Sequence, residues 1–203
     1  MDKKLLKPLV FVLSLVPLAG LVFIVLTGRT SANPAEDILL TTGIWALRFL
    51  LATLAITPIR RLTGWNVLIQ YRRMLGLFAF FYASVHLVSY IAFDRYFEFG
   101  EVFADVAKRP FITAGMAAFA LMAPLALTST RGWIRRLGRK WQTLHRLVYF
   151  SAAAACVHFI WKVKLVLGEP VYYAILLAML LGFRLIWRWR SRQPIAQRAV
   201  SRG

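Results

Sequence analysis

Three histidines are the residues of this 203-residue chain whose type and spacing point to chemistry. His86 lies within a long run that carries no charge, and His145 and His158 lie thirteen positions apart across another apolar stretch. An ionisable side chain costs free energy in hydrocarbon, so within a membrane segment it is a functional candidate by default. A neutral imidazole is also a common metal ligand and a usual axial ligand of haem iron. Two histidines about 20 Å apart on one helix that rises about 1.5 Å per residue therefore indicate two stacked redox centres.

The composition of the chain indicates a membrane protein. It is 60% hydrophobic, with a mean hydropathy of +0.63 and a formal net charge of +18. The charges are interrupted by apolar segments close to the roughly 20 residues that a membrane-spanning helix needs. We expect residues 1–203 to form one domain with a basic cytoplasmic tail over 189–203, and we find no convincing internal repeat. The apolar segments predict an all-α integral membrane protein, a bundle of six transmembrane helices over residues 8–28, 38–59, 73–93, 111–130, 144–162 and 170–188.

The distribution of charge predicts the orientation of the bundle. Lysines and arginines gather at both ends of the chain and in the second and fourth connections between helices, whereas seven of the eight acidic residues fall in the other loops. Because short loops rich in lysine and arginine stay in the cytoplasm, both termini are predicted to be cytoplasmic. The basic surplus then reflects topology, so we expect membrane lipid around the chain and no nucleic-acid partner.

Depth in the membrane decides which histidines can meet. The third and fifth predicted helices both run outward, so His86 and His158 lie near the outer face and His145 lies near the inner face. The heights of His86 and His158 differ by roughly 6 Å, which allows them to clamp one outer haem iron. The haem would be the noncovalent b type, because the chain has one cysteine and no CxxCH motif. On an ideal helix His145 and His158 point about 140° apart, so a tilt, a π-bulge or laterally offset haems are needed to use both.

Basic residues surround the predicted position of His145. A second, inner haem finds no further histidine on the third helix, so we expect His145 either to ligate an inner haem iron or to mark the electron entry site. Arginine is a poor iron ligand but a good partner for a haem propionate, a flavin phosphate or a quinone carbonyl. Arg48 in the second helix is expected to pair with a propionate. An inner rim of basic residues could receive a flavin phosphate, although the positive-inside rule alone also explains these charges. The rim consists of Arg72, Arg73, Arg136, Arg139 and Lys140.

Five segments carry a resemblance to a known family. They are TGIWALRFLLATLAITPIRR, RRMLGLFAFFYASVHLVSY, KRPFITAG, LALTSTRGWIRRLGRKWQTLHRLVYF and HFIWKVK, and together they cover most of the chain from about Asp37 to Lys164. The LGRKWQTLHRLVY segment, with another histidine thirteen residues after its own, is quite specific. The chain resembles the MsrQ family, the haem-binding membrane subunits of bacterial MsrPQ methionine sulfoxide reductase systems, within the ferric-reductase-like transmembrane family. Relative to the two histidine pairs of that broader family, the fourth histidine is missing here, and we expect no appended flavin and nicotinamide domain.

The resemblance implies a role in electron transfer across the bacterial inner membrane. Electrons would come from the quinone pool, or from a flavin such as FMN supplied by a cytoplasmic flavin reductase, and would pass through one or two b-type haems. The implied acceptor is a periplasmic MsrP-type molybdenum subunit, which forms a heterodimer with the membrane subunit and reduces methionine sulfoxide in proteins. His86 and His158 would hold the outer haem, and His145 would lie at the electron entry side. The chain would then be a noncatalytic redox subunit of an oxidoreductase complex.

Two other classes of protein stay open. A stand-alone transmembrane reductase of external ferric or cupric ions would use the same histidines, so only the resemblance separates it from a redox subunit. A small transporter would use Arg48 and the histidines as substrate or proton sites. It would bind no haem and would usually show paired repeats or broken helices.

Overall fold

The computed structural model describes residues 3–163 and 168–191, and all regular structure within them is helical. Six stretches of helix are long and apolar enough to cross a membrane, which confirms the prediction of an all-α, multi-pass membrane protein. Residues 192–203 of the predicted basic tail lie outside the described residues. The elements are α1 (Lys3–Leu26), α2 (Pro34–Thr63), the 3₁₀ segment η1 (Asn66–Tyr71), α3 (Arg72–Ser89), the π-helical turn η2 (Tyr90–Asp94), α4 (Phe99–Lys108), α5 (Pro110–Leu127), α6 (Arg131–Leu137), α7 (Arg139–Leu144), α8 (Leu147–Val163) and α9 (Glu169–Arg190).

The sequence of α2 explains where this helix begins and ends. Pro34 occupies the first turn, where its missing N–H costs nothing, and the Asn33 side chain accepts a hydrogen bond from the backbone N–H of Glu36. The helix ends at Thr63 and is capped by Gly64, whose φ of 75° favours glycine and whose N–H donates to the Arg60 carbonyl. Acidic residues in the first turn and arginines in the last complement the helix dipole. These signals give α2 enough length to reach both faces of the membrane.

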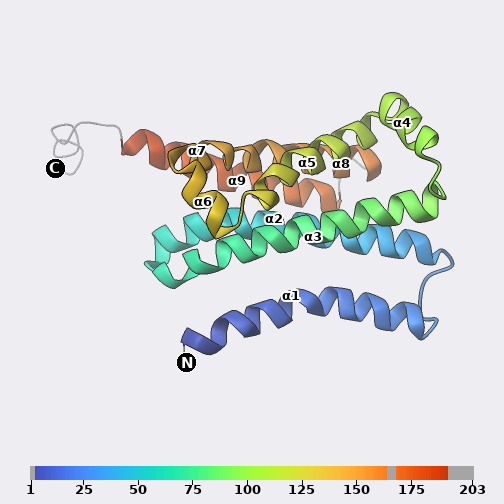
Figure 1. Cartoon of the computed structure of the whole chain (residues 1–203), viewed down its shortest axis with the longest axis horizontal. Coiled ribbons are helices and arrows are strands. Elements are labelled where there is room, and N and C mark those ends of the chain that lie inside the picture. Colours follow the sequence, from blue (N-terminus) through green and yellow to red (C-terminus); the bar gives the residue numbers. More distant parts are fainter. Residues whose placement is uncertain (1–2, 164–167, 192–203) are drawn as a thin grey trace.

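Two helix pairs form the centre of the bundle. Figure 1 shows α2 beside α3 and α5 beside α8, with α1 along one side. The remaining long helix, α9, packs on α8 and α2. The first described helix begins, and the last ends, at the same end of the bundle, as six spans require. That this end is cytoplasmic stays a prediction from the positive-inside rule.

Small residues allow close packing within and between these pairs. Ala79 of α3 and Ala152 of α8 are fully buried. Ser151 of α8 is equally buried, and its hydroxyl donates a hydrogen bond to the Ala118 carbonyl of α5 at 2.9 Å. Small side chains let helix backbones approach closely where lipid supplies no hydrophobic driving force. This packing holds the two helices that carry His86 and His158.

Short helical elements that were not predicted from the sequence lie at the ends of the bundle. The elements α6 and α7 lie toward the end that holds the termini, and α4 lies at the opposite end (Figure 1). The helix predicted over residues 144–162 is divided, because α7 ends at Leu144 and α8 begins at Leu147, so His145 lies in a turn between them. The angle of about 140° between His145 and His158, which assumed one ideal helix, therefore does not apply.

Candidate functional site

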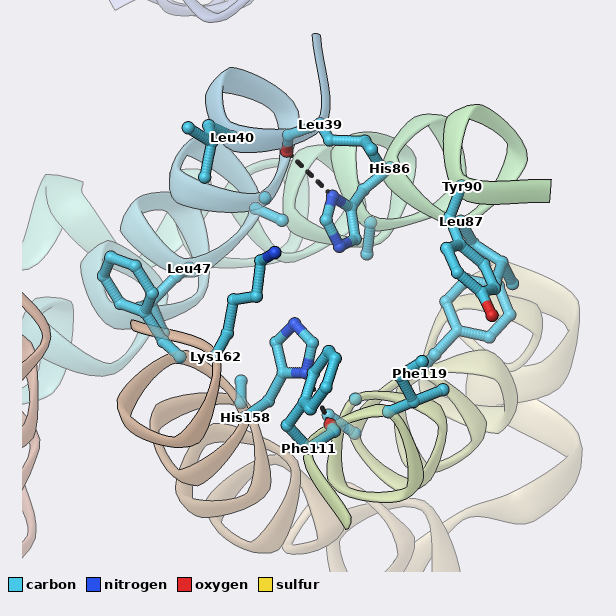
Figure 2. Close-up of a pocket in the computed structure, with 18 of the residues that line it drawn as sticks. Leu39, Leu40, Leu47, His86, Leu87, Tyr90, Phe111, Phe119, His158 and Lys162 are labelled. Atoms are coloured by element: carbon cyan, nitrogen blue, oxygen red, sulfur yellow. Dashed lines mark hydrogen bonds between the residues drawn. The ribbon is translucent and has the colours of Figure 1, made fainter. Parts of the chain in front are cut away.

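His86 and His158 line a cavity of about 410 Å³ that lies between the two helix pairs. Its volume falls in the range of about 300–1,000 Å³ that is usual for small-molecule and cofactor sites. His86 comes from α3 and His158 from α8, and Figure 2 shows the two rings facing each other from opposite walls. Most of the other lining residues are apolar, from α2, α3, α5 and α8. The cavity therefore combines an apolar wall with two convergent polar groups.

Backbone carbonyls hold both imidazoles in place. Nδ1 of His86 donates to the Leu39 carbonyl at 2.9 Å, and Nδ1 of His158 donates to the Phe111 carbonyl at 2.6 Å. A carbonyl oxygen can only accept, so each Nδ1 carries the proton and each Nε2 keeps a free lone pair. In Figure 2 these second nitrogens point toward the space between the rings. Both side chains are thus fixed in the tautomer that can ligate a metal through Nε2.

The spacing of the rings fits one metal ion between them. Their centres are 6.1 Å apart and their planes are inclined by 78°. An imidazole nitrogen lies about 1.1 Å from its ring centre, given C–N bonds of about 1.33 Å, and a metal–imidazole bond is about 2.0 Å. Two imidazoles on opposite sides of one ion therefore have centres about 6 Å apart.

The donor set favours iron in a macrocycle over a metal held by protein alone. Among the described residues no group of three or more His, Cys, Asp or Glu side chains is placed to hold a metal ion. Two opposed imidazoles supply the two axial ligands of a haem, whose ring provides the remaining four. The residues present therefore fit a bis-histidine haem.

Charged side chains line the mouth of this cavity. Lys162 lies one helical turn beyond His158, and in Figure 2 its side chain extends toward the gap between the two rings. Arg109, Glu36 and Asp94 also line the cavity. Lysine and arginine beside an apolar cavity can pair with the carboxylates of a bound group through charge-assisted hydrogen bonds.

Asp105 anchors α4 at this mouth. Its carboxylate is buried, pairs with Arg95 and Arg109, and accepts a hydrogen bond from the Tyr90 hydroxyl at 2.5 Å. Burial by itself would raise the pKa of Asp105. Hydrogen bonds from Tyr90 and Arg95 and the positive charges of Arg109 and Arg95 outweigh burial and hold the pKa below its ordinary value of 3.8. Since Tyr90 and Arg109 both line the cavity, this cluster braces its rim.

Replacing Asp105 with asparagine should loosen the rim and lower the free energy of unfolding at pH 7 by about 1–3 kcal/mol, because hydrogen bonds to a charged group are worth about that much. The depressed pKa means that the stabilisation is present above the ordinary value of 3.8 and is lost as the pH falls through the lower folded value. The difference in thermal stability between Asp105→Asn and the unaltered protein should therefore shrink in acid. Unfolding in detergent from pH 7 to pH 3 measures it, with Glu101→Gln, on the exposed side of the same helix, as the control. If Asp105→Asn and the unaltered protein were equally stable at pH 7, Asp105 would not stabilise the rim of the cavity.

A second cavity, of about 520 Å³, surrounds His145. The imidazole stacks on Trp141, with ring centres 3.8 Å apart, and its Nδ1 donates to the Trp141 carbonyl at 3.1 Å. Nε2 is buried and makes no hydrogen bond within the part of the chain that the structure describes. Arg72 and Arg73 line the same cavity. An imidazole nitrogen without a partner and two guanidinium groups together fit a bound group that carries oxygen atoms or a metal.

The two cavities adjoin each other. Leu50 of α2 and Met122 of α5 line both of them, and both side chains are buried. A thin apolar layer therefore separates the site of His86 and His158 from the site of His145.

The structure does not bring the other predicted basic residues to either cavity. Nε of Arg48 donates to the Tyr173 hydroxyl of α9 at 2.8 Å, and the guanidinium lies 4.9 Å from the centre of the Trp45 ring. The exposed residues of α6 and α7 include Arg136, Arg139 and Lys140. Of the predicted inner rim, only Arg72 and Arg73 line the cavity of His145.

Two glycines that were not among the predicted site residues also belong to the outer site. Gly43 lies against the His86 ring, and Gly115 lies against the His158 ring. In both cases the histidine follows the glycine by 43 positions. This equal spacing could have identified Gly43 and Gly115 from the sequence.

Comparison with known proteins places the chain among membrane redox proteins. A family model described as "Ferric reductase like transmembrane component" matches residues 42–156. The chain is 48% identical over 191 residues to "Protein-methionine-sulfoxide reductase heme-binding subunit MsrQ" of Herminiimonas arsenicoxydans, a match that covers 93% of this chain and 88% of that protein. A protein of the same name from Xanthomonas euvesicatoria pv. vesicatoria is 52% identical over 169 residues, which cover 83% of this chain and 78% of that protein. No solved structure matches the chain.

Proposed function

Because this chain belongs to the ferric reductase-like transmembrane family and, within it, to the MsrQ haem-binding subunits, we propose that it is a b-type cytochrome subunit that passes electrons to a periplasmic MsrP-type reductase of methionine sulfoxide. The observation that carries this proposal is the pair of facing imidazoles, with ring centres 6.1 Å apart, in an apolar cavity. The family and the multi-pass fold support a location in the bacterial inner membrane. The chain itself would perform no substrate chemistry and would serve as the redox subunit of a heterodimer.

In this proposal His86 and His158 would hold the iron of the outer haem from its two sides. A haem bound in this cavity supplies one-electron transfer. The Leu39 and Phe111 carbonyls fix the tautomer and orientation of both imidazoles, so the ligands change little between redox states. With His86 and His158 both bound to it, the iron would keep no site for a substrate, which would suit electron transfer over substrate binding. Lys162 and Arg109 at the mouth would pair with the propionates.

We propose that the inner cavity receives electrons. His145 would either ligate an inner haem iron or hydrogen-bond a bound electron donor through Nε2, the buried atom that has no partner among the described residues. Arg72 and Arg73 would bind the oxygen atoms of a quinone headgroup or the phosphate of FMN. The termini would be cytoplasmic, and this cavity would then lie on the cytoplasmic side, because His145 lies at the end of the bundle where α7 leads into α8. Electrons would then move outward, toward the periplasm.

The haem content of the purified protein tests the proposal most directly. Protein from haem-replete cells should be red, with a low-spin reduced spectrum, and should yield noncovalent haem b as a pyridine haemochrome. One haem per chain would indicate that His145 marks an electron entry site, and two haems per chain would indicate that His145 ligates an inner haem. A colourless preparation without extractable haem would contradict the cytochrome proposal and favour the transporter alternative.

A further inference from the structure

Two copies of one local arrangement hold the two cavity histidines. The carbonyl that accepts the hydrogen bond from His86 belongs to Leu39, and the carbonyl that accepts from His158 belongs to Phe111. Each carbonyl precedes its histidine by 47 positions, and a glycine follows each carbonyl by four positions, one turn further along α2 or α5. The carbonyl, the glycine and the histidine of the second copy all lie 72 positions after those of the first.

The same offset relates the walls of the cavity. It has 26 lining residues, of which 22 form eleven pairs whose second member lies 72 positions after the first. The four unpaired residues, at the mouth, are Asn33, Glu36, Asp94 and Arg109. The pairs α2–α3 and α5–α8 therefore enclose the cavity as two related halves, which face each other in Figure 2. This relation between the two halves is visible in the lining of the cavity and was not found in the sequence by itself.

The two glycines leave the space that the imidazoles occupy. A β-carbon on Gly115 would lie 2.7 Å from Nδ1 and 3.0 Å from Cε1 of His158. A β-carbon on Gly43 would lie 3.0 Å from Cε1 and 3.1 Å from Nδ1 of His86. A contact below 3.0 Å forces atoms to shift, and here the crowded atom is the one that donates to the carbonyl. Any larger residue at these positions must turn or displace the ring, more at Gly115 than at Gly43.

We propose that Gly43 and Gly115 are positioning residues that set the rotation of the two axial imidazoles and keep each Nδ1 hydrogen-bonded to its carbonyl. The inference rests on the proposed haem site between His86 and His158. Hydrogen bonding of the outer imidazole nitrogen raises the basicity of the ligating one, which stabilises ferric over ferrous iron and lowers the midpoint potential. The angle between the ring planes, 78° here, governs the anisotropy of the low-spin ferric signal. The glycines thus act on both properties without touching the iron.

The test replaces each glycine with alanine in the purified haem-loaded protein and compares redox titrations and low-temperature electron paramagnetic resonance spectra. Gly115→Ala should raise the midpoint potential of the outer haem and move its largest g value, because the hydrogen bond to Phe111 is weakened and the His158 ring turns. Gly43→Ala should shift both readouts in the same sense by less. The matched controls are Gly20→Ala in α1 and Gly182→Ala in α9, where a β-carbon meets nothing within 4 Å. Both controls should keep the original potential and spectrum.

The outcomes separate this inference from the proposed function. An unchanged potential and spectrum in both Gly115→Ala and Gly43→Ala would overturn the inference and leave the haem site standing. A shift of the same size in Gly182→Ala would also overturn it, since that change touches no ring. Loss of haem from folded Gly115→Ala, with haem retained in Gly182→Ala, supports it. If Gly115→Ala does not fold, the potential and the spectrum of Gly43→Ala test the inference in its place. A wild-type protein without low-spin haem would instead refute the proposed function.

Discussion

Replacing either His86 or His158 with alanine is expected to abolish one and the same low-spin haem signal. Each histidine would supply one axial bond to a shared iron, so loss of either leaves the same centre five-coordinate or empty. The affinity of the outer site for haem should fall by about tenfold or more, since even loss of a residue that only hydrogen-bonds a ligand costs about 10–100-fold in metal affinity. Optical spectra and pyridine haemochrome analysis of the purified variants measure the loss.

His145→Ala is the matched control, because it removes an imidazole that lines the other cavity. This variant should keep the outer low-spin signal and should lose either a second haem species or the rate of reduction by the electron donor. Loss of one common signal in His86→Ala and His145→Ala, with that signal intact in His158→Ala, would show that the facing rings of Figure 2 do not share an iron.

Chemically reduced protein is expected to be reoxidised rapidly by an MsrP-type partner in the presence of methionine sulfoxide, and only slowly when either is omitted. Asp94 and Arg109, which line the cavity of His86 and His158, lie on either side of α4 in the chain, so a partner that docks at α4 would approach this cavity. Anaerobic stopped-flow spectroscopy at the haem absorption bands measures the rate. Reoxidation that ignores partner and sulfoxide but is rapid with ferric chelates would favour the stand-alone metal reductase.

Changes of surface charge in α4 and at Glu98, the residue before it, should alter the rate of this reaction without changing the haem spectrum. Glu98 and Glu101 are exposed, so Glu98→Gln and Glu101→Gln should alter the association rate and its dependence on salt. Arg135→Gln, an exposed change on α6 near the other end of the bundle, is the control and should leave the rate unchanged. An equal effect from Arg135→Gln would argue against docking at α4.

The sequence by itself determined the class of protein and the candidate ligands. Hydropathy is a local property, so apolar stretches of about 20 residues identify membrane spans without knowledge of their neighbours. The alternation of basic and acidic loops likewise predicts depth, and depth grouped His86 with His158 and set His145 apart. The sequence also indicated the family, because the segment around His145 is specific enough to show the resemblance.

Rotation about each helix and contacts between distant segments were decided only by the tertiary structure. Arg48 was assigned to a propionate by depth alone, whereas packing of α9 turns it to Tyr173. The turn at His145 depends on how α7 and α8 meet, which periodicity along one helix does not encode. The relation between the two halves of the cavity is hard to find in the sequence, because positions 72 apart such as Leu50 and Met122 share only their apolar character. The two halves correspond most plainly at the glycines and histidines, because Gly43 and Gly115 leave the space that the imidazoles occupy and each imidazole donates to a carbonyl 47 positions before it.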